Sequence, residues 1–147
     1  MISSGLKYSF LHSVDLIEKL SVENVKINVT AIMTVDQVSS VLEALSKGPG
    51  GYISVFAGRI ADVGLDPLPI MQEVVEVLKG HPNIELIWAS PRELYNVVQA
   101  SEIGCDIITA TNDILRKLPT LGKDLDQFSL ETVKMFHDDA KEAGFTV

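Results

Sequence analysis

The sequence is poor in the features that mark secreted, membrane and nucleic-acid-binding proteins. A single cysteine, Cys105, excludes an internal disulfide framework and is compatible with a reducing cytoplasm, where we expect this protein. No apolar run approaches the roughly 18 residues of a membrane-spanning helix, and the first 12 residues lack the pattern of a secretory signal. The formal net charge of -8 argues against binding to nucleic acid or to an anionic membrane.

Motifs for common cofactors are missing as well. No Gly-x-Gly-x-x-Gly segment or Walker-type loop follows any expected strand, so nucleotide binding has no motif support. The histidines His12, His81 and His137 lack the spacing of metal ligands, and we expect no metal site.

What the chain does contain is a regular alternation of strand and helix signals, in 147 residues of which 46% are hydrophobic. Strands are predicted at residues 25–32, 52–57, 84–89 and 105–110. Helices are predicted from Thr34 to the Gly48 region and at about residues 67–79, 90–103, 112–118 and 129–143. Thr34 with Gln37, and Ser90 with Glu93, have the spacing of capping boxes. The pattern predicts one α/β domain over residues 1–147 with a parallel sheet.

Polar residues gather towards the carboxyl ends of the first three strands, and these residues are the candidate site. Two architectures fit the alternation, a doubly wound sheet and part of an eight-stranded barrel, and polar groups on several strand ends favour the barrel. Alternation along a strand puts Asn28 and Thr30 on one face, and Ser54 and Phe56 on one face. The spacing predicts that Arg92 lies in the first turn of a helix, where a bound anion would be favoured. The residues suited to binding a phosphorylated small molecule are Arg59, Ser90 and Arg92.

Four segments resemble the transaldolase family, including its small fructose-6-phosphate aldolase group. They are Ile27 to Thr34 with Gln37, Tyr52 to Asp62, Trp88 to Arg92, and Gly104 to Thr109, which are similar to the regions of strands five, six, seven and eight. The resemblance runs from about Val14 to the C-terminus and leaves residues 1–13 unmatched.

The resemblance implies strands five to eight of a TIM (β/α)8 barrel with a C-terminal helix. It also implies Schiff-base transfer, or aldol cleavage, of a dihydroxyacetone unit from a sugar phosphate in pentose phosphate metabolism, without a metal or organic cofactor. Asn28, Thr30, Ser54 and Phe56 would line the pocket, and Arg59, Ser90 and Arg92 would hold the phosphate. The family also implies a homo-oligomer, with the C-terminal helix packed on a neighbouring subunit.

The Schiff-base lysine of the family is not found, so the catalytic residue is unknown. It belongs on the fourth strand, close to Met1 by counting back, where no Lys-Ile-Pro-like strand is visible. Lys7 lies in the unmatched segment, and Lys26 lies at the N-terminal end of its strand. Three interpretations stay open: a transaldolase-type enzyme, an inactive truncated fragment or sugar-phosphate-binding remnant, and a half-barrel completed by a partner chain.

Overall fold

A computed structural model describes residues 3–145, with side chains described from Ser13 onward, and divides the chain into two units, residues 1–112 and 113–147. The expectations placed on the Lys7 and His12 side chains and on the 1–13 segment therefore lie largely outside the described residues. The elements of the first unit are, in order, α1 (Ser3–Val22), β1 (Ile27–Ile32), α2 (Val35–Leu45), β2 (Gly51–Val55), α3 (Ala57–Asp62), α4 (Pro67–Leu78), β3 (Ile84–Trp88), α5 (Tyr95–Glu102) and β4 (Ile107–Ile108).

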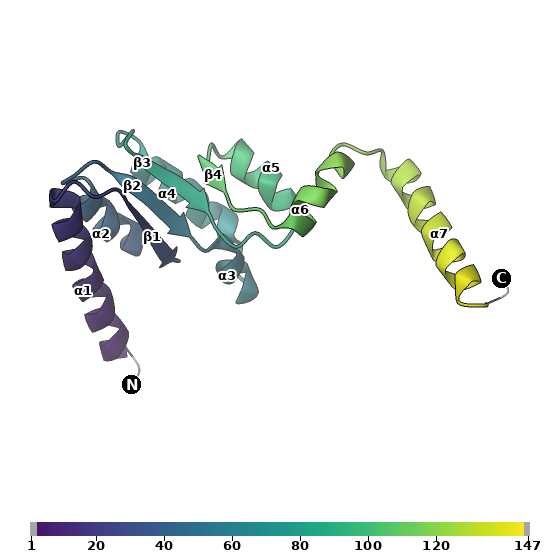
Figure 1. Ribbon diagram of the computed structural model, residues 1–147, viewed down its shortest axis with the longest axis horizontal. Helices are drawn as coiled ribbons and strands as arrows, with labels where there is room; N and C mark the ends of the chain where they lie inside the picture. Colours follow the sequence, from purple (N-terminus) through teal and green to yellow (C-terminus); the bar gives the residue numbers. More distant parts are fainter. Residues whose placement is uncertain (1–2, 146–147) are drawn as a thin grey trace. The chain divides into compact units, whose positions relative to one another are not determined.

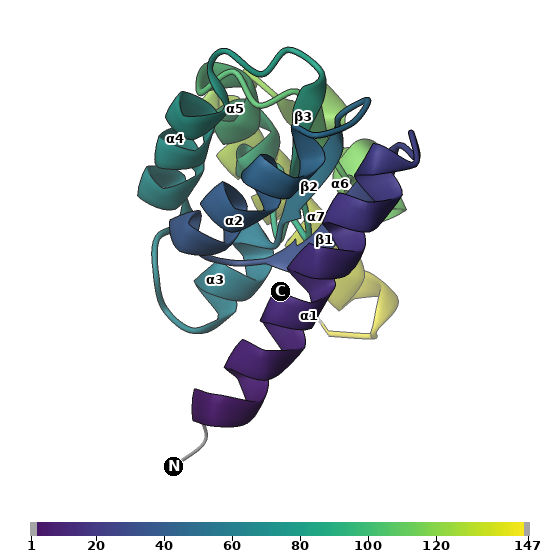
Figure 2. The ribbon, with the colours of Figure 1, turned by 90° about the vertical axis from the view of Figure 1, so that its left-hand side faces the viewer.

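The four strands form one parallel sheet in the order β1-β2-β3-β4, which confirms the predicted α/β class. Each new strand is added on the same side of the previous one, whereas a doubly wound sheet reverses its strand order at a switch point. Helices α2 and α4 lie on one face of this sheet (Figures 1 and 2). Strand order and helix placement are consistent with part of a TIM-like barrel, in which the helices form an outer ring.

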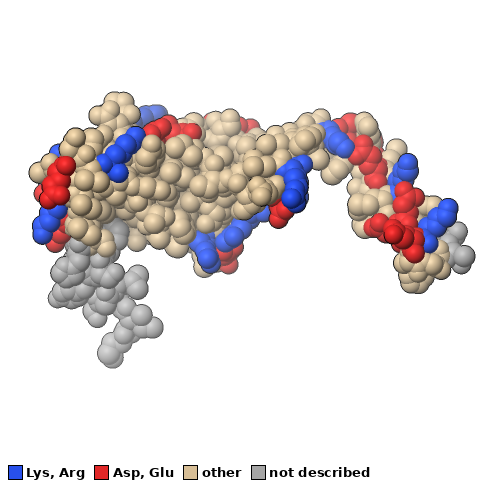
Figure 3. Space-filling view, viewed as in Figure 1, with Lys and Arg blue, Asp and Glu red and all other residues tan. Residues whose placement is uncertain are grey.

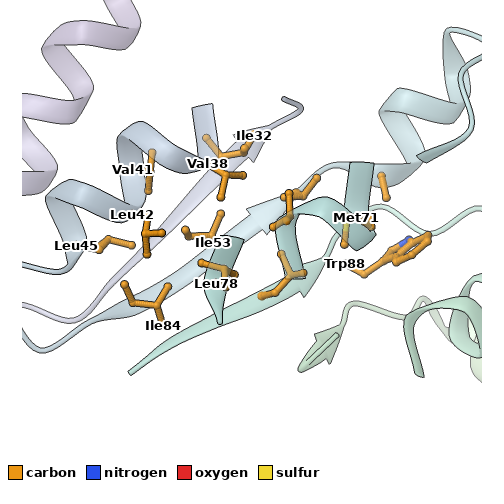
Figure 4. Packing of buried hydrophobic residues seen from close by; sticks show 14 of the residues in the cluster. Ile32, Val38, Val41, Leu42, Leu45, Ile53, Met71, Leu78, Ile84 and Trp88 are labelled. Carbon is orange, nitrogen blue, oxygen red and sulfur yellow. The ribbon is translucent and has the colours of Figure 1, made fainter. Parts of the chain in front are cut away.

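The core lies between the sheet and these helices. Val38, Val41 and Leu45 on α2 are fully buried, and the spacing of one apolar helix face directs them onto Ile53 of β2 (Figure 4). On the strand β1, exposure alternates with the side-chain direction, so that Ile27 and Val29 are half-buried while Asn28 and Thr30 are exposed. The sheet therefore has a covered face, towards α2 and α4, and an open face.

Local signals explain where α2 and α4 begin. The backbone N–H of Gln37 donates to Thr34 Oγ1 at 3.2 Å, and the Gln37 side chain accepts from the N–H of Thr34 at 3.2 Å, which confirms this capping box. Asp66 Oδ1 accepts from the N–H of Leu68 at 2.9 Å, and Pro67 occupies the first turn of α4.

The second predicted capping box is wrong. The helix α5 begins at Tyr95, after Leu94, and no side chain caps it, so Arg92 lies in the loop before the helix and not in its first turn. The reason is that Asn96 Oδ1 accepts from the N–H of Glu93 at 3.1 Å, which is the amide that a Ser90 cap would need. Ser90 itself has a left-handed backbone, with φ of 57°.

Two further segments differ from expectation. Residues 58–66, which lie between the strand predicted at 52–57 and the helix predicted at 67–79, contain most of the short helix α3. Arg59 is therefore a helical residue and does not extend the strand. The strand β1 contains a bulge, because residues 30 and 31 lie between the paired positions Val29 and Ile32 and Ala31 has φ of 64°.

The second unit begins at the second residue of α6 (Asn112–Lys117) and continues with a single 3-10 turn (Leu118–Thr120) and α7 (Leu125–Glu142). The helix α7 is amphipathic and starts four residues earlier than the helix predicted at residues 129–143. Its apolar side chains Leu125, Phe128, Val133 and Phe136 are exposed. Among the described residues, no helix is both long enough and apolar enough to cross a membrane.

Candidate functional site

Asn28 and Ser54 meet on the open face of the sheet. Ser54 Oγ donates to Asn28 Oδ1 at 2.8 Å, across the neighbouring strands β1 and β2. Ser54 is 4% exposed, whereas Asn28 is exposed, so the bond leaves the Asn28 amide group able to donate towards solvent or a ligand. Two of the predicted pocket residues therefore form one polar pair.

Arg59 and Arg92 meet at the carboxyl edge of the sheet through a single carboxylate, Asp62. Arg92 holds it with two parallel bonds, from Nε to Asp62 Oδ1 at 3.0 Å and from Nη2 to Oδ2. Arg59 Nη1 lies 4.0 Å from Asp62 Oδ2, one helical turn away on α3. Two guanidinium groups at one edge form the arrangement that recognises phosphate and carboxylate oxygens.

Gly58 allows the Arg92 side chain to lie close to the backbone of the helix α3. A Cβ atom at Gly58 would lie 1.6 Å from the Ser90 carbonyl oxygen and 3.1 Å from Arg92 Nε. No side chain fits between the two segments, and this close approach brings the end of β3 against the start of α3. The absence of a side chain at Gly58 therefore determines how close Arg92 comes to Asp62.

Asn96 holds the backbone on the other side of Arg92. Its Oδ1 accepts from the N–H of Arg92 at 2.8 Å, and its Nδ2 donates to Gln99 Oε1 at 2.9 Å. Arg92 is thus fixed at its backbone by α5 and at its guanidinium by α3, although its side chain is 46% exposed.

The remaining predicted residues lie near the same edge, and within residues 13–145 their side chains make no hydrogen bond to this cluster. Thr30 is exposed at the bulge of β1. Phe56 is half-buried just before α3, and its N–H donates to the carbonyl of Ile32 at 2.8 Å. Ser90 is half-buried, and within residues 13–145 its hydroxyl has no hydrogen-bond partner.

Lys26 lies on the open face at the opposite end of the strands. Its Nζ is 4.4 Å from the centre of the Tyr52 ring and 3.7 Å from Glu85 Oε2. The Tyr52 side chain, with a smaller effect of Glu85, raises the pKa of Lys26 and keeps the amine charged. Because a Schiff-base lysine must be neutral to attack a carbonyl, this environment argues against Lys26 as the nucleophile.

The charge distribution agrees with a site at the edge of the sheet. In Figure 3, seen from the side of Figure 1, the middle of the first unit is largely uncharged and its charged side chains lie towards its borders. Within residues 13–145, no group of three or more His, Cys, Asp or Glu side chains is placed to hold a metal ion.

Two residues of this site, Asp62 and Asn96, are not among those that the sequence predicts. Asp62 follows Arg59 by three positions, the spacing of neighbours on a helix. Asn96 follows Arg92 by four positions, but Arg92 lies in the loop before α5. These spacings carry information only once residues 57–62 are known to be helical and α5 is known to begin at Tyr95.

The fold and the edge cluster define an α/β protein with a parallel four-stranded sheet, consistent with a partial TIM-barrel-like domain. The chain belongs to the transaldolase/fructose-6-phosphate aldolase family, whose model matches residues 11–147. This confirms the resemblance seen in the sequence.

Curated relatives agree with the family match. The chain is 34% identical over 120 residues to a probable transaldolase of Caldicellulosiruptor saccharolyticus, covering 80% of this chain and 50% of the relative. It is 38% identical over 100 residues to a probable transaldolase of Methanococcus maripaludis, covering 67% and 45%. A probable transaldolase of Nitrosopumilus maritimus is 31% identical over 103 residues, covering 69% and 45%. The chain thus spans about half the length of these relatives.

Proposed function

We propose that this chain is a transaldolase-type protein that binds a sugar phosphate, with β1 to β4 corresponding to strands five to eight of the family barrel. The observation that carries the proposal is the pair Arg59 and Arg92, gathered on Asp62 at the carboxyl edge of a parallel sheet. Active sites of barrels are built at this edge. The reaction is Schiff-base transfer, or aldol cleavage, of a dihydroxyacetone unit, when a nucleophilic lysine is supplied.

Each predicted residue has a role in this proposal. Arg59 and Arg92 donate N–H groups to the phosphate oxygens, and the hydroxyl of Ser90 adds a further donor. The amide of Asn28, oriented by Ser54, donates to an oxygen of the sugar chain. Thr30 and Phe56 form the wall of the pocket.

A second candidate function is sugar-phosphate binding without catalysis. Two observations favour it for this chain by itself. None of the four strands contains a lysine, and Lys26, next to β1, is held in its charged form by Tyr52 and Glu85. An amine in that state is a poor nucleophile.

The open face of the sheet leads us to propose that another chain covers it. Asn28 and Thr30 are exposed there, and in the described residues β1 and β4 each pair on one side only. Open edges of a sheet favour pairing with further strands. A second copy of this chain, or a partner chain that carries the remaining strands, would complete the barrel in the cytoplasm, and only the partner chain would supply the lysine. Light scattering of the purified chain tests self-association. If the chain is strictly monomeric, the second copy is excluded and only a partner chain can complete the barrel.

The phosphate assignment is tested by calorimetric titration with fructose 6-phosphate. We expect Arg92→Ala and Arg59→Ala each to weaken binding by about 10- to 100-fold, which is the loss expected when hydrogen bonds to a charged group are removed. Arg116→Ala is the matched control, because Arg116 is also paired with an aspartate three positions away, at 3.3 Å. Unchanged binding in Arg92→Ala would overturn the proposal.

Borohydride trapping separates the two functions. If this chain binds without catalysis, incubation with fructose 6-phosphate and borohydride yields no covalent adduct by mass spectrometry. An adduct on a lysine of this chain alone would exclude the binding-only function and identify the nucleophile.

A further inference from the structure

We propose that Asp62 is a positioning residue for the phosphate, and that it acts by orienting Arg92. The inference rests on the proposed function, because it assumes that Arg92 binds the ligand. Asp62 lies at the last position of α3, and its two carboxylate oxygens accept from two different nitrogens of Arg92. Such a two-bonded geometry fixes the plane of the guanidinium group as well as its position.

The bonds to Asp62 leave enough donors for a ligand. A guanidinium group has five N–H donors, and Asp62 takes one on Nε and one on Nη2 of Arg92. The second hydrogen of Nη2 and both hydrogens of Nη1 stay available on the far side of the group. Arg59 is 4.0 Å from Asp62, too far for a hydrogen bond, and keeps all of its donors.

Three separate contacts converge on the same side chain. The backbone of Arg92 is held by Asn96 at 2.8 Å, its Nε lies next to Gly58, and its guanidinium group is held by Asp62. One contact comes from α5 and the other two come from α3. Without Asp62, the end of a long and 46% exposed side chain would be free to adopt many rotamers.

The negative charge of Asp62 also opposes an anionic ligand, and the two effects must be weighed. The carboxylate is 41% exposed and Arg59 is 61% exposed, so solvent screens the repulsion. Arg59, Arg92 and Asp62 taken together still carry one net positive charge. Solvent does not weaken the second effect, which is the ordering of the Arg92 side chain. Any ligand that uses the Arg92 donors has to immobilise this side chain, and Asp62 already does so. Orientation therefore outweighs repulsion, and removal of Asp62 weakens binding.

The test is a double-mutant cycle, measured by calorimetric titration with fructose 6-phosphate at constant pH and ionic strength. We expect Asp62→Asn to weaken binding about two- to tenfold, the range for loss of order in one long side chain. In the Arg92→Ala background, Asp62→Asn should cause no further loss. Asp113→Asn is the matched control, because Asp113 is also an exposed aspartate paired with an arginine.

The outcomes separate this inference from the proposed function. If Arg92→Ala has no effect on binding, the phosphate assignment fails. If Arg92→Ala weakens binding but Asp62→Asn leaves it equal or tightens it, only the role of Asp62 is overturned. Nitrogen NMR of the Arg92 Nε–H group supplies a readout that a general structural role would not change. Asp62→Asn should broaden or lose that signal, while circular dichroism shows the same melting temperature.

Discussion

The covered and open faces of the sheet are built from alternate residues of the same strands and carry different properties. On the covered face, Ile53 of β2 and Leu86 of β3 are buried against α2 and α4. On the open face, Asn28 and Thr30 are exposed, and the neighbouring polar groups bond to one another. One face thus contributes most of the folding free energy, while the other can carry polar groups for binding at little cost in stability.

The largest expected difference between the faces is in stability. Ile53→Ala on the covered face should lower the free energy of unfolding by about 2–5 kcal/mol, because Ile53 is fully buried and its loss leaves a cavity. Thr30→Ala, at an exposed position of the next strand, should change it by less than about 0.5 kcal/mol. Urea denaturation of both variants measures the difference. Similar losses would show that the open face is also part of the core.

Gly58→Ala is expected to affect both stability and binding, because Gly58 lies where the strand ends meet α3. The added Cβ would overlap the Ser90 carbonyl oxygen, at 1.6 Å, so we expect a loss of about 1–3 kcal/mol in stability. It would also displace Arg92 Nε, at 3.1 Å, and weaken fructose 6-phosphate binding.

Gly64→Ala is the comparison variant for Gly58. Its backbone has φ of 82° but no atom within 4 Å of an added Cβ, so it should cost about 1 kcal/mol through conformation alone. Binding of fructose 6-phosphate should be unaffected. Equal loss of affinity in both variants would mean that general destabilisation, and not the position of Arg92, explains the result.

A smaller effect is expected at the start of α2, which covers the sheet. Thr34→Ala removes the Oγ1 acceptor of the Gln37 N–H and should lower stability by about 1 kcal/mol. Ser39→Ala, at an exposed position in the same helix, is the control and should stay within about 0.5 kcal/mol. Fructose 6-phosphate should bind to both variants as to the wild type. A change in affinity in Thr34→Ala would indicate that α2 contributes to the open face.

Features that depend on neighbouring residues could be predicted from the sequence, whereas features that depend on competing contacts could not. Thr34 and Gln37 were identified because both partners of the capping box lie within one helical turn. The start of α5 was misplaced because Asn96, beyond the expected box, bonds to the amide that Ser90 would have capped. Local spacing could not reveal this competition.

The candidate site was only partly visible for a related reason. Arg59 and Arg92 could be chosen because each follows a strand, but their meeting point depends on the register between β2 and β3 and on the helical form of residues 57–62. Asp62 was therefore overlooked, although it lies inside the motif that carried the family resemblance.

The smallest expected effect concerns the charge of Lys26 at the other end of the open face. Tyr52 raises the pKa of Lys26 in the folded protein above its ordinary value of 10.5, so this contact adds stability below about pH 10.5 and the gain is lost as the pH rises through the folded-state pKa. Tyr52→Phe keeps the ring, removes the hydroxyl and should shift the NMR titration of Lys26 to lower pH. Tyr95→Phe, at an exposed tyrosine of α5, should leave it unchanged. An identical titration in Tyr52→Phe and wild type would show that Tyr52 does not raise the pKa of Lys26.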